Sequence, residues 1–135
     1  METNCLAEDI RQEHRLKYRY ATSEQWYKGS LHLHTNRSDG HLSVTDLVKM
    51  YAAEKYDFIS VTDHWCLPEL NGNRGALPLL VINGIELDGY DAQGSYYHVL
   101  AIGASSRPSL FTRNYLKTLR TLYSQGAVLI WAHPH

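Results

Sequence analysis

Two histidines separated by one residue, His32 and His34, constrain this chain more than any other feature. In an extended strand, side chains at positions i and i+2 lie on the same face, so the two imidazoles lie side by side, while Leu31 and Leu33 lie on the other face. A turn at 38–40 follows, and it brings a carboxylate close to the two rings. Neutral imidazole is the commonest protein ligand of divalent transition metals, and a carboxylate complements it. The segment therefore predicts a metal site at the end of a strand.

Three later stretches have the same character, because each places a histidine or a carboxylate at or near the end of an apolar run. They are residues 60–64, residues 83–88 with 97–99, and residues 130–135. An isolated His-x-His pair is better explained by two exposed histidines on an edge strand. Four such stretches in one chain favour a metal centre over that alternative.

In order, these four stretches resemble the motifs of the PHP family, the metal-dependent phosphoesterases named for polymerase and histidinol phosphatase. Residues 32–40 match His-x-His-Thr-x-x-Ser-Asp-Gly without a gap, and residues 62–64 match Thr-Asp-His. Residues 84–86 match Gly-x-Glu and are followed by a strand that carries His98. Residues 132–134 match Ala-His-Pro. The order of the four motifs makes the resemblance specific.

Apolar runs and turn residues predict an alternation of strands and helices. The expected elements are strands at 26–34, 56–62, 79–82, 95–102 and 127–131, a helix capped by Ser43, a helix at 109–125, a loop at 65–78 and turn-forming residues at 88–94. This order is typical of α/β proteins, whose barrels hold their active sites after the C-terminal ends of strands. The resemblance implies a distorted seven-stranded (β/α) barrel, of which this sequence supplies the first four or five strands.

Two regions are expected along the chain. Residues 1–25 are polar and charge-rich, with a weak helical stripe at 7–20, and form an N-terminal extension. Residues 26–135 form the PHP domain. The resemblance implies that this domain is incomplete at its C-terminus, because the family's last motif, an Asp-x-His beyond the fourth, is missing. The final strand is then an open edge through which oligomers can form.

The resemblance implies two metal positions that share one carboxylate. His32 and His34 bind the first metal together with Glu86, and Glu86 bridges to a second metal that His98 and His133 complete. Plainer alternatives remain open: Glu86 as a solvated turn residue, and His98 as a core histidine bonded to a backbone carbonyl. An unpaired carboxylate buried after the apolar run that precedes Glu86 would cost several kcal/mol, which favours a paired one.

The resemblance also implies a third metal, bound by Asp39 and His64. The alternative for Asp39 is a turn former whose side chain bonds the backbone. Asp63 is expected to accept a hydrogen bond from an imidazole and to orient that ring. Arg37, inside the first motif, is expected either to contact a phosphate oxygen or to be an exposed turn residue. Asp63 and Arg37 are therefore the residues predicted to assist catalysis beside the metal ligands.

The predicted ligands indicate hydrolysis at a metal centre. Imidazole mixed with carboxylate suits Zn²⁺, Mn²⁺ or Fe²⁺ better than Mg²⁺ or Ca²⁺. Two or three such ions, about 3.5–4 Å apart, can activate a water and hold the attacking and leaving oxygens of an ester. The expected substrate is a small phosphorylated molecule or a nucleotide. Neither G-x-S-x-G nor a P-loop sequence is present, so a serine hydrolase or a P-loop phosphotransferase is not predicted.

Two other functions fit the same motifs: a free or polymerase-associated nuclease of the family, and a metal-binding fragment without activity. A net charge of −1 gives no basic surface for nucleic acid, which is therefore not favoured as a partner. Cys5 and Cys66 lie far apart, and the first 15 residues contain no apolar signal segment. No apolar run is long enough to span a bilayer, so a cytoplasmic protein is expected.

Overall fold

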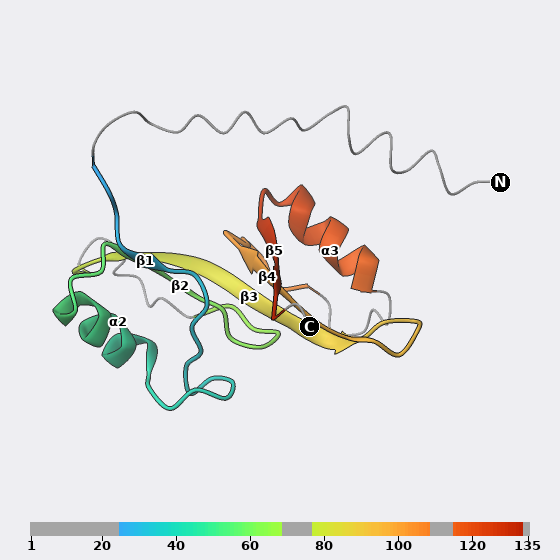
Figure 1. The fold of residues 1–135 in the computed structure, drawn as a ribbon, viewed down its shortest axis with the longest axis horizontal. Helices are drawn as coiled ribbons and strands as arrows, with labels where there is room; N and C mark the ends of the chain where they lie inside the picture. The colour runs from blue at the N-terminus through green and yellow to red at the C-terminus, as the bar shows by residue number, and fades with distance from the viewer. Residues whose placement is uncertain (1–24, 69–76, 109–114, 134–135) are drawn as a thin grey trace.

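The structure, a computed structural model, describes residues 25–68, 77–108 and 115–133. The helix predicted at 7–20 therefore lies outside the described residues, as do parts of the predicted loop at 65–78 and helix at 109–125. The described elements are β1 (Gly29–Ser30), α2 (Val44–Ala53), β2 (Phe58–Val61), β3 (Leu80–Tyr90), β4 (Tyr96–Ile102), α3 (Tyr115–Ser124) and β5 (Val128–Ala132) (Figure 1).

The five strands form one mixed sheet with the order β1-β2-β3-β4-β5. Strands β1, β2 and β3 are parallel, whereas β4 is antiparallel to both β3 and β5. The long, curved β3 joins the two halves of the sheet, with β1 and β2 along its first part and β4 beside its second part (Figure 1). The curled α/β sheet is consistent with part of an α/β barrel.

Strand β3 is longer than predicted, and the expected turn at 88–94 is shorter. The strand has 11 residues and continues to Tyr90. Its first four residues pair with β2, and residues 84–90 pair with β4. The local sequence Asp88-Gly89 favours a turn, but pairing with Tyr97 and His98 of β4 satisfies the backbone there and overrides that preference.

The first predicted strand, 26–34, is reduced to the two residues of β1. Beyond it the chain still runs beside the end of β2, but a side chain takes part in the pairing. The backbone N–H of Leu33 donates to Oγ1 of Thr62 at 3.1 Å, and the N–H of Thr62 donates to the carbonyl of Leu33 at 2.8 Å. These two bonds fix the segment that carries the histidine pair.

Helix α2 begins where the sequence predicts. Oγ of Ser43 accepts a hydrogen bond from the N–H of Asp46 at 3.2 Å and donates to the Asp46 carboxylate at 2.7 Å. The first bond satisfies one of the N–H groups that a helix start leaves unpaired. Leu47 and Val48 are buried in one apolar cluster with Ile59 and the neighbouring residues of β2 and β3.

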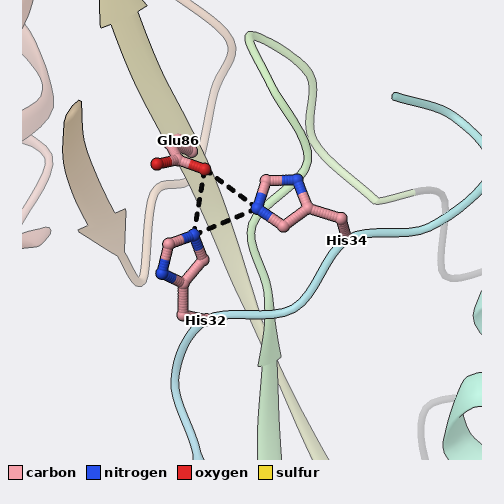
Figure 2. A group of neighbouring side chains, drawn as sticks. All are labelled: His32, His34 and Glu86. Carbon is pink, nitrogen blue, oxygen red and sulfur yellow. Dashed lines mark hydrogen bonds and ion pairs between the residues drawn. The ribbon is translucent and has the colours of Figure 1, made fainter. Parts of the chain in front are cut away.

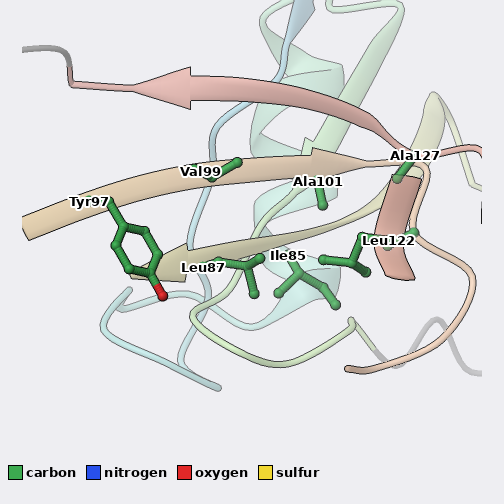
Figure 3. Close-up of a cluster of buried hydrophobic side chains, with 8 residues drawn as sticks. Ile85, Leu87, Tyr97, Val99, Ala101, Leu122 and Ala127 are labelled. Atoms are coloured by element: carbon green, nitrogen blue, oxygen red, sulfur yellow. The ribbon is translucent and has the colours of Figure 1, made fainter. Parts of the chain in front are cut away.

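Helix α3 covers the other part of the sheet, and this packing determines where the functional side chains lie. Ile85 and Leu87 of β3 are buried together with Val99 of β4 and Leu122 of α3 (Figure 3). Successive side chains of a strand point to opposite faces. The residues between these apolar ones, among them Glu86, therefore lie on the face of the sheet opposite α3.

Candidate metal centre

Five predicted ligands converge at one end of the sheet, as their positions in the sequence predicted. His32 and His34 follow β1, and His133 follows β5. His98 lies near the start of β4, and because β4 is antiparallel to β3, this end of β4 meets the C-terminal part of β3, where Glu86 lies. The described residues of this end contain three groups able to hold a metal ion: His32, His34 and Glu86; His34, Asp39 and His64; Glu86, His98 and His133.

His32, His34 and Glu86 form a nearly equilateral triangle of ligand atoms (Figure 2). Nε2 of His32 lies 2.9 Å from Oε2 of Glu86 and 3.0 Å from Nε2 of His34, which is itself 2.9 Å from the same oxygen. Two ligands about 2.1 Å from one metal ion lie about 3.0–3.6 Å apart for angles of 90–120° at the ion. The three atoms thus have the spacing of three ligands on one side of a cation.

The second oxygen of Glu86 faces the other two histidines. Oε1 lies 2.6 Å from Nδ1 of His98 and 3.9 Å from Nε2 of His133. The carboxylate therefore presents one oxygen to His32 and His34 and the other oxygen to His98 and His133. This is the arrangement that a carboxylate bridging two cations requires. The bridging role itself stays a prediction.

The third group is more exposed, and it combines Asp39, in the turn of the first motif, with His34 and His64. Oδ1 of Asp39 lies 2.9 Å from Nδ1 of His34, and Oδ2 lies 3.6 Å from Nε2 of His64. Gly40 is needed for this turn, because a Cβ there would clash with the carbonyl of His34. The structure thus brings Asp39 and His64 together, and their role as ligands of a third metal also stays a prediction.

Glu86 is the electrostatic centre of the site. Its side chain is only 1% exposed, and burial alone would raise its pKa. Hydrogen bonds from His34, His98 and His32 outweigh burial and hold the pKa of Glu86 far below its usual value. The hydrogen bond to Glu86 raises the pKa of His34, although burial of the ring opposes that shift. The buried anion thus favours positive charge around it, carried by protons or by a metal ion.

A glycine allows β3 to approach β2 just before Glu86. A Cβ at Gly84 would lie 2.7 Å from both Oγ of Ser60 and Cγ2 of Thr62, closer than real side chains approach one another. Packing therefore explains the glycine of the Gly-x-Glu motif. The close approach of the strands also brings Glu86 beside His64, and these two residues form a parallel β-bridge.

The predicted contact of Asp63 with an imidazole is wrong. Asp63 is fully buried, and its carboxylate accepts hydrogen bonds at 2.6 Å from three donors: the N–H of Thr35, the hydroxyl of Thr35 and the hydroxyl of Ser38. These bonds hold the loop that follows the histidine pair. Asp63 therefore shapes the loop on which Asp39 lies.

The carboxylate that contacts His64 in place of Asp63 is that of Asp88, which sequence reasoning missed. Its Oδ1 lies 2.9 Å from Nδ1 of His64. The signal was present in the sequence, since Glu86 and Asp88 are two residues apart and so share one face of a strand. The prediction of a turn at 88–94 concealed it.

Arg37 is exposed on the loop of the first motif. Burial raises the pKa of the nearby Cys66 thiol, while a hydrogen bond and the positive charge of Arg37 act in the opposite direction. Arg37 thus lies close to Cys66, two residues beyond His64. Its predicted contact with a phosphate oxygen stays a prediction.

No family model matches the chain, and no curated protein matches it. Solved structures do. One is a two-domain protein from Bacteroides vulgatus that contains a predicted PHP-like metal-dependent phosphoesterase, with a TM-score of 0.66 and 28% identity, covering 80% of this chain and 35% of that one. Another is an amidohydrolase from Chromobacterium violaceum with bound sulfate and no metal, with a TM-score of 0.52 and 23% identity, covering 72% of this chain and 32% of that one.

The first neighbour supports the resemblance to the PHP family, and the curled sheet is consistent with part of an α/β barrel. The second neighbour shows the fold alone. The chain spans about a third of the length of each of these solved structures. Within the described residues, no helix is both long and apolar enough to cross a membrane.

Proposed function

We propose that this chain is a metal-dependent hydrolase that cleaves a phosphoric ester of a small phosphorylated molecule or a nucleotide. The observation that carries the proposal is the buried carboxylate of Glu86, which has the imidazoles of His32, His34 and His64 near one oxygen and those of His98 and His133 near the other. The PHP-like neighbour supports metal-dependent hydrolysis in general. We also propose that the curled sheet forms part of a seven-stranded barrel.

In this proposal, His32, His34 and Glu86 hold one divalent cation, and Glu86, His98 and His133 hold another. Asp39 and His64 contribute to a third position. Such donors suit Zn²⁺, Mn²⁺ or Fe²⁺, and the bound ions would supply an activated water and charge stabilisation for the phosphoryl group.

The residues of the chain prepare this chemistry without the ions. Glu86 stays ionised because its pKa is held low, so it is an anionic ligand throughout the neutral range. Asp63 fixes the loop that carries Arg37 and Asp39. Arg37, exposed on that loop, is proposed to bind a phosphate oxygen of the substrate.

The test is turnover of p-nitrophenyl phosphate and of a nucleotide with Mn²⁺, comparing the parent with His34→Ala. His34 contributes to two of the three groups, so its loss should abolish tight binding of the first ion and most activity. His41→Ala is the matched control, since His41 is exposed on the same segment and belongs to none of the three groups.

Equal turnover by parent and His34→Ala at limiting Mn²⁺ would refute the proposed site. Metal binding without turnover would favour a non-catalytic metal-binding role. Digestion of single-stranded DNA in place of small substrates would indicate a nuclease.

A further inference from the structure

The second carboxylate of β3, Asp88, links a candidate metal ligand to a tyrosine. Its Oδ1 accepts a hydrogen bond from Nδ1 of His64 at 2.9 Å, and its Oδ2 accepts one from the hydroxyl of Tyr96 at 3.0 Å. Asp88 belongs to none of the candidate metal groups among the described residues. Both of its oxygens are thus occupied by protein donors.

Contacts from two sides fix the backbone around Asp88 and His64. Asp88 lies directly across from His98 in the register of β3 and β4, and Tyr90 lies across from Tyr96. The indole N–H of Trp65 donates to the carbonyl of Asp88 at 3.1 Å, which ties the residue after His64 to β3. His64 and Asp88 are therefore held opposite each other by two independent sets of contacts.

This contact determines which nitrogen of His64 is free to bind a cation. A neutral imidazole carries one proton, and a carboxylate beside Nδ1 keeps the proton on that nitrogen, which leaves the Nε2 lone pair exposed. Nε2 lies 3.6 Å from Oδ2 of Asp39 and 3.7 Å from Oε2 of Glu86. These separations are long for hydrogen bonds, but they are close to the spacing of two ligands of one ion.

Tyr96 is well placed to hold Asp88 in this role. Its ring packs edge-on against His98, with centroids 4.8 Å apart, and also contacts the ring of Tyr90 at 4.9 Å. The Tyr96 hydroxyl donates to Oδ2 of Asp88 at 3.0 Å. A substitution that removes only the hydroxyl would leave the ring contacts in place.

We propose that Asp88 is the positioning residue that fixes the tautomer and direction of His64, and that the Tyr96 hydroxyl in turn fixes Asp88. The network would thereby determine how well the position between Asp39 and His64 holds a cation. The part of this inference that concerns cations rests on the proposed function. The orientation of His64 is a property of the metal-free protein and is tested separately.

The first experiment measures the tautomer of His64 by ¹⁵N NMR of the imidazoles in the metal-free protein. The parent and Tyr90→Phe should show the proton on Nδ1. Asp88→Ala should show mixed tautomers, whereas Asp88→Asn, which keeps a carbonyl oxygen as acceptor, should restore the Nδ1–H form. An unchanged tautomer in Asp88→Ala would overturn the proposal.

The second experiment titrates Mn²⁺ and follows the ions by electron paramagnetic resonance. Asp88→Ala should lower the affinity for one Mn²⁺ ion by about 10–100-fold, which is the usual range for a residue that orients a metal-bound histidine. Tyr96→Phe should lower the affinity for the same ion less, by about three- to tenfold, because the contact of Asp88 with His64 remains. Tyr90→Phe is the control, because it removes a hydroxyl from the same aromatic pair without touching Asp88, and it should change nothing.

His64→Ala tests whether Asp88 acts through His64. If it does, Asp88→Ala should add no further loss of Mn²⁺ affinity once His64 is changed. Additive losses in the double variant, or equal Mn²⁺ affinities of Tyr96→Phe and the parent, would refute the network. A parent protein that binds no Mn²⁺ would refute the proposed function, while the tautomer measurement would still decide the orientation of His64.

Discussion

Replacing Glu86 with glutamine should destabilise the metal-free protein and weaken the pH dependence of its stability. Glu86→Gln keeps the volume of the side chain but removes its charge. The carboxylate has three short contacts with imidazoles, at 2.9 Å from His32, 2.9 Å from His34 and 2.6 Å from His98. A hydrogen bond to a charged group contributes about 1.5–3 kcal/mol and a neutral one about 1 kcal/mol. The loss of unfolding free energy over three contacts is therefore about 1.5–6 kcal/mol, a range that includes the roughly 3–5 kcal/mol for breaking a buried ion pair.

The sign of this pH dependence follows from the opposite pKa shifts of Glu86 and His34. The pKa of Glu86 is lowered from 4.5, so its contribution to stability is fully present above about pH 4.5 and is lost as the pH falls below that value. The pKa of His34 is raised from 6.5, so its contribution is fully present below about pH 6.5 and is lost as the pH rises through the higher, folded-state pKa. The metal-free parent should be most stable between these values, and Glu86→Gln should flatten both slopes.

The measurement is urea denaturation of metal-free protein at a series of pH values between 3 and 9. Glu54→Gln is the matched control, because Glu54 is an exposed glutamate at the end of α2 and its change should cost less than about 0.5 kcal/mol. The prediction is refuted if Glu86→Gln lowers the free energy of unfolding by less than about 1 kcal/mol near pH 5.5, or if the variant has the same pH dependence of stability as the parent. The imidazoles would then not be bound to this carboxylate as described.

Three further changes test the frame around the site. Gly84→Ala should lower the free energy of unfolding by about 1–3 kcal/mol, because its Cβ would meet Ser60 and Thr62; a neutral result in urea denaturation would contradict the close approach of β3 to β2. Ser43→Ala should cost about 1 kcal/mol by the same measurement, through loss of the N-cap of α2. Strand β5 is an edge of the described sheet, and its Trp131 is 56% exposed, so the chain should self-associate and Trp131→Lys should reduce association in light scattering; a monomeric parent would refute this.

Local signals in the sequence predicted those features that depend on a few neighbouring residues. The N-cap of α2 needs only Ser43 and Asp46, and it was predicted correctly. The positions of His32 and His34 just beyond a strand also follow from a short motif and its apolar flanks, whereas Glu86 lies within β3 and not at a strand end. The fold class followed from the order of the elements, since alternating strands and helices have few compact arrangements.

Features that depend on pairing between distant segments were not predicted. The length of β3 depends on β4, which covers its second part and overrides the turn preference of Asp88 and Gly89. The roles of Asp63 and Asp88 also depend on contacts between segments that are distant in the sequence. Asp63 is adjacent to His64 in sequence, yet its carboxylate bonds Thr35 and Ser38, while Asp88 reaches His64 from another strand.

The alternation of β3 links the core to the site. Ile85 and Leu87 are buried beneath α3, and Glu86 and Asp88 occupy the opposite face between the histidines. A shift of the strand by one residue would exchange the two sets, placing two carboxylates in an apolar core and two large aliphatic side chains among the imidazoles. The hydrophobic packing of α3 on β3 therefore also fixes the register of the candidate ligands, so a core substitution that slips β3 should abolish metal binding without touching any ligand.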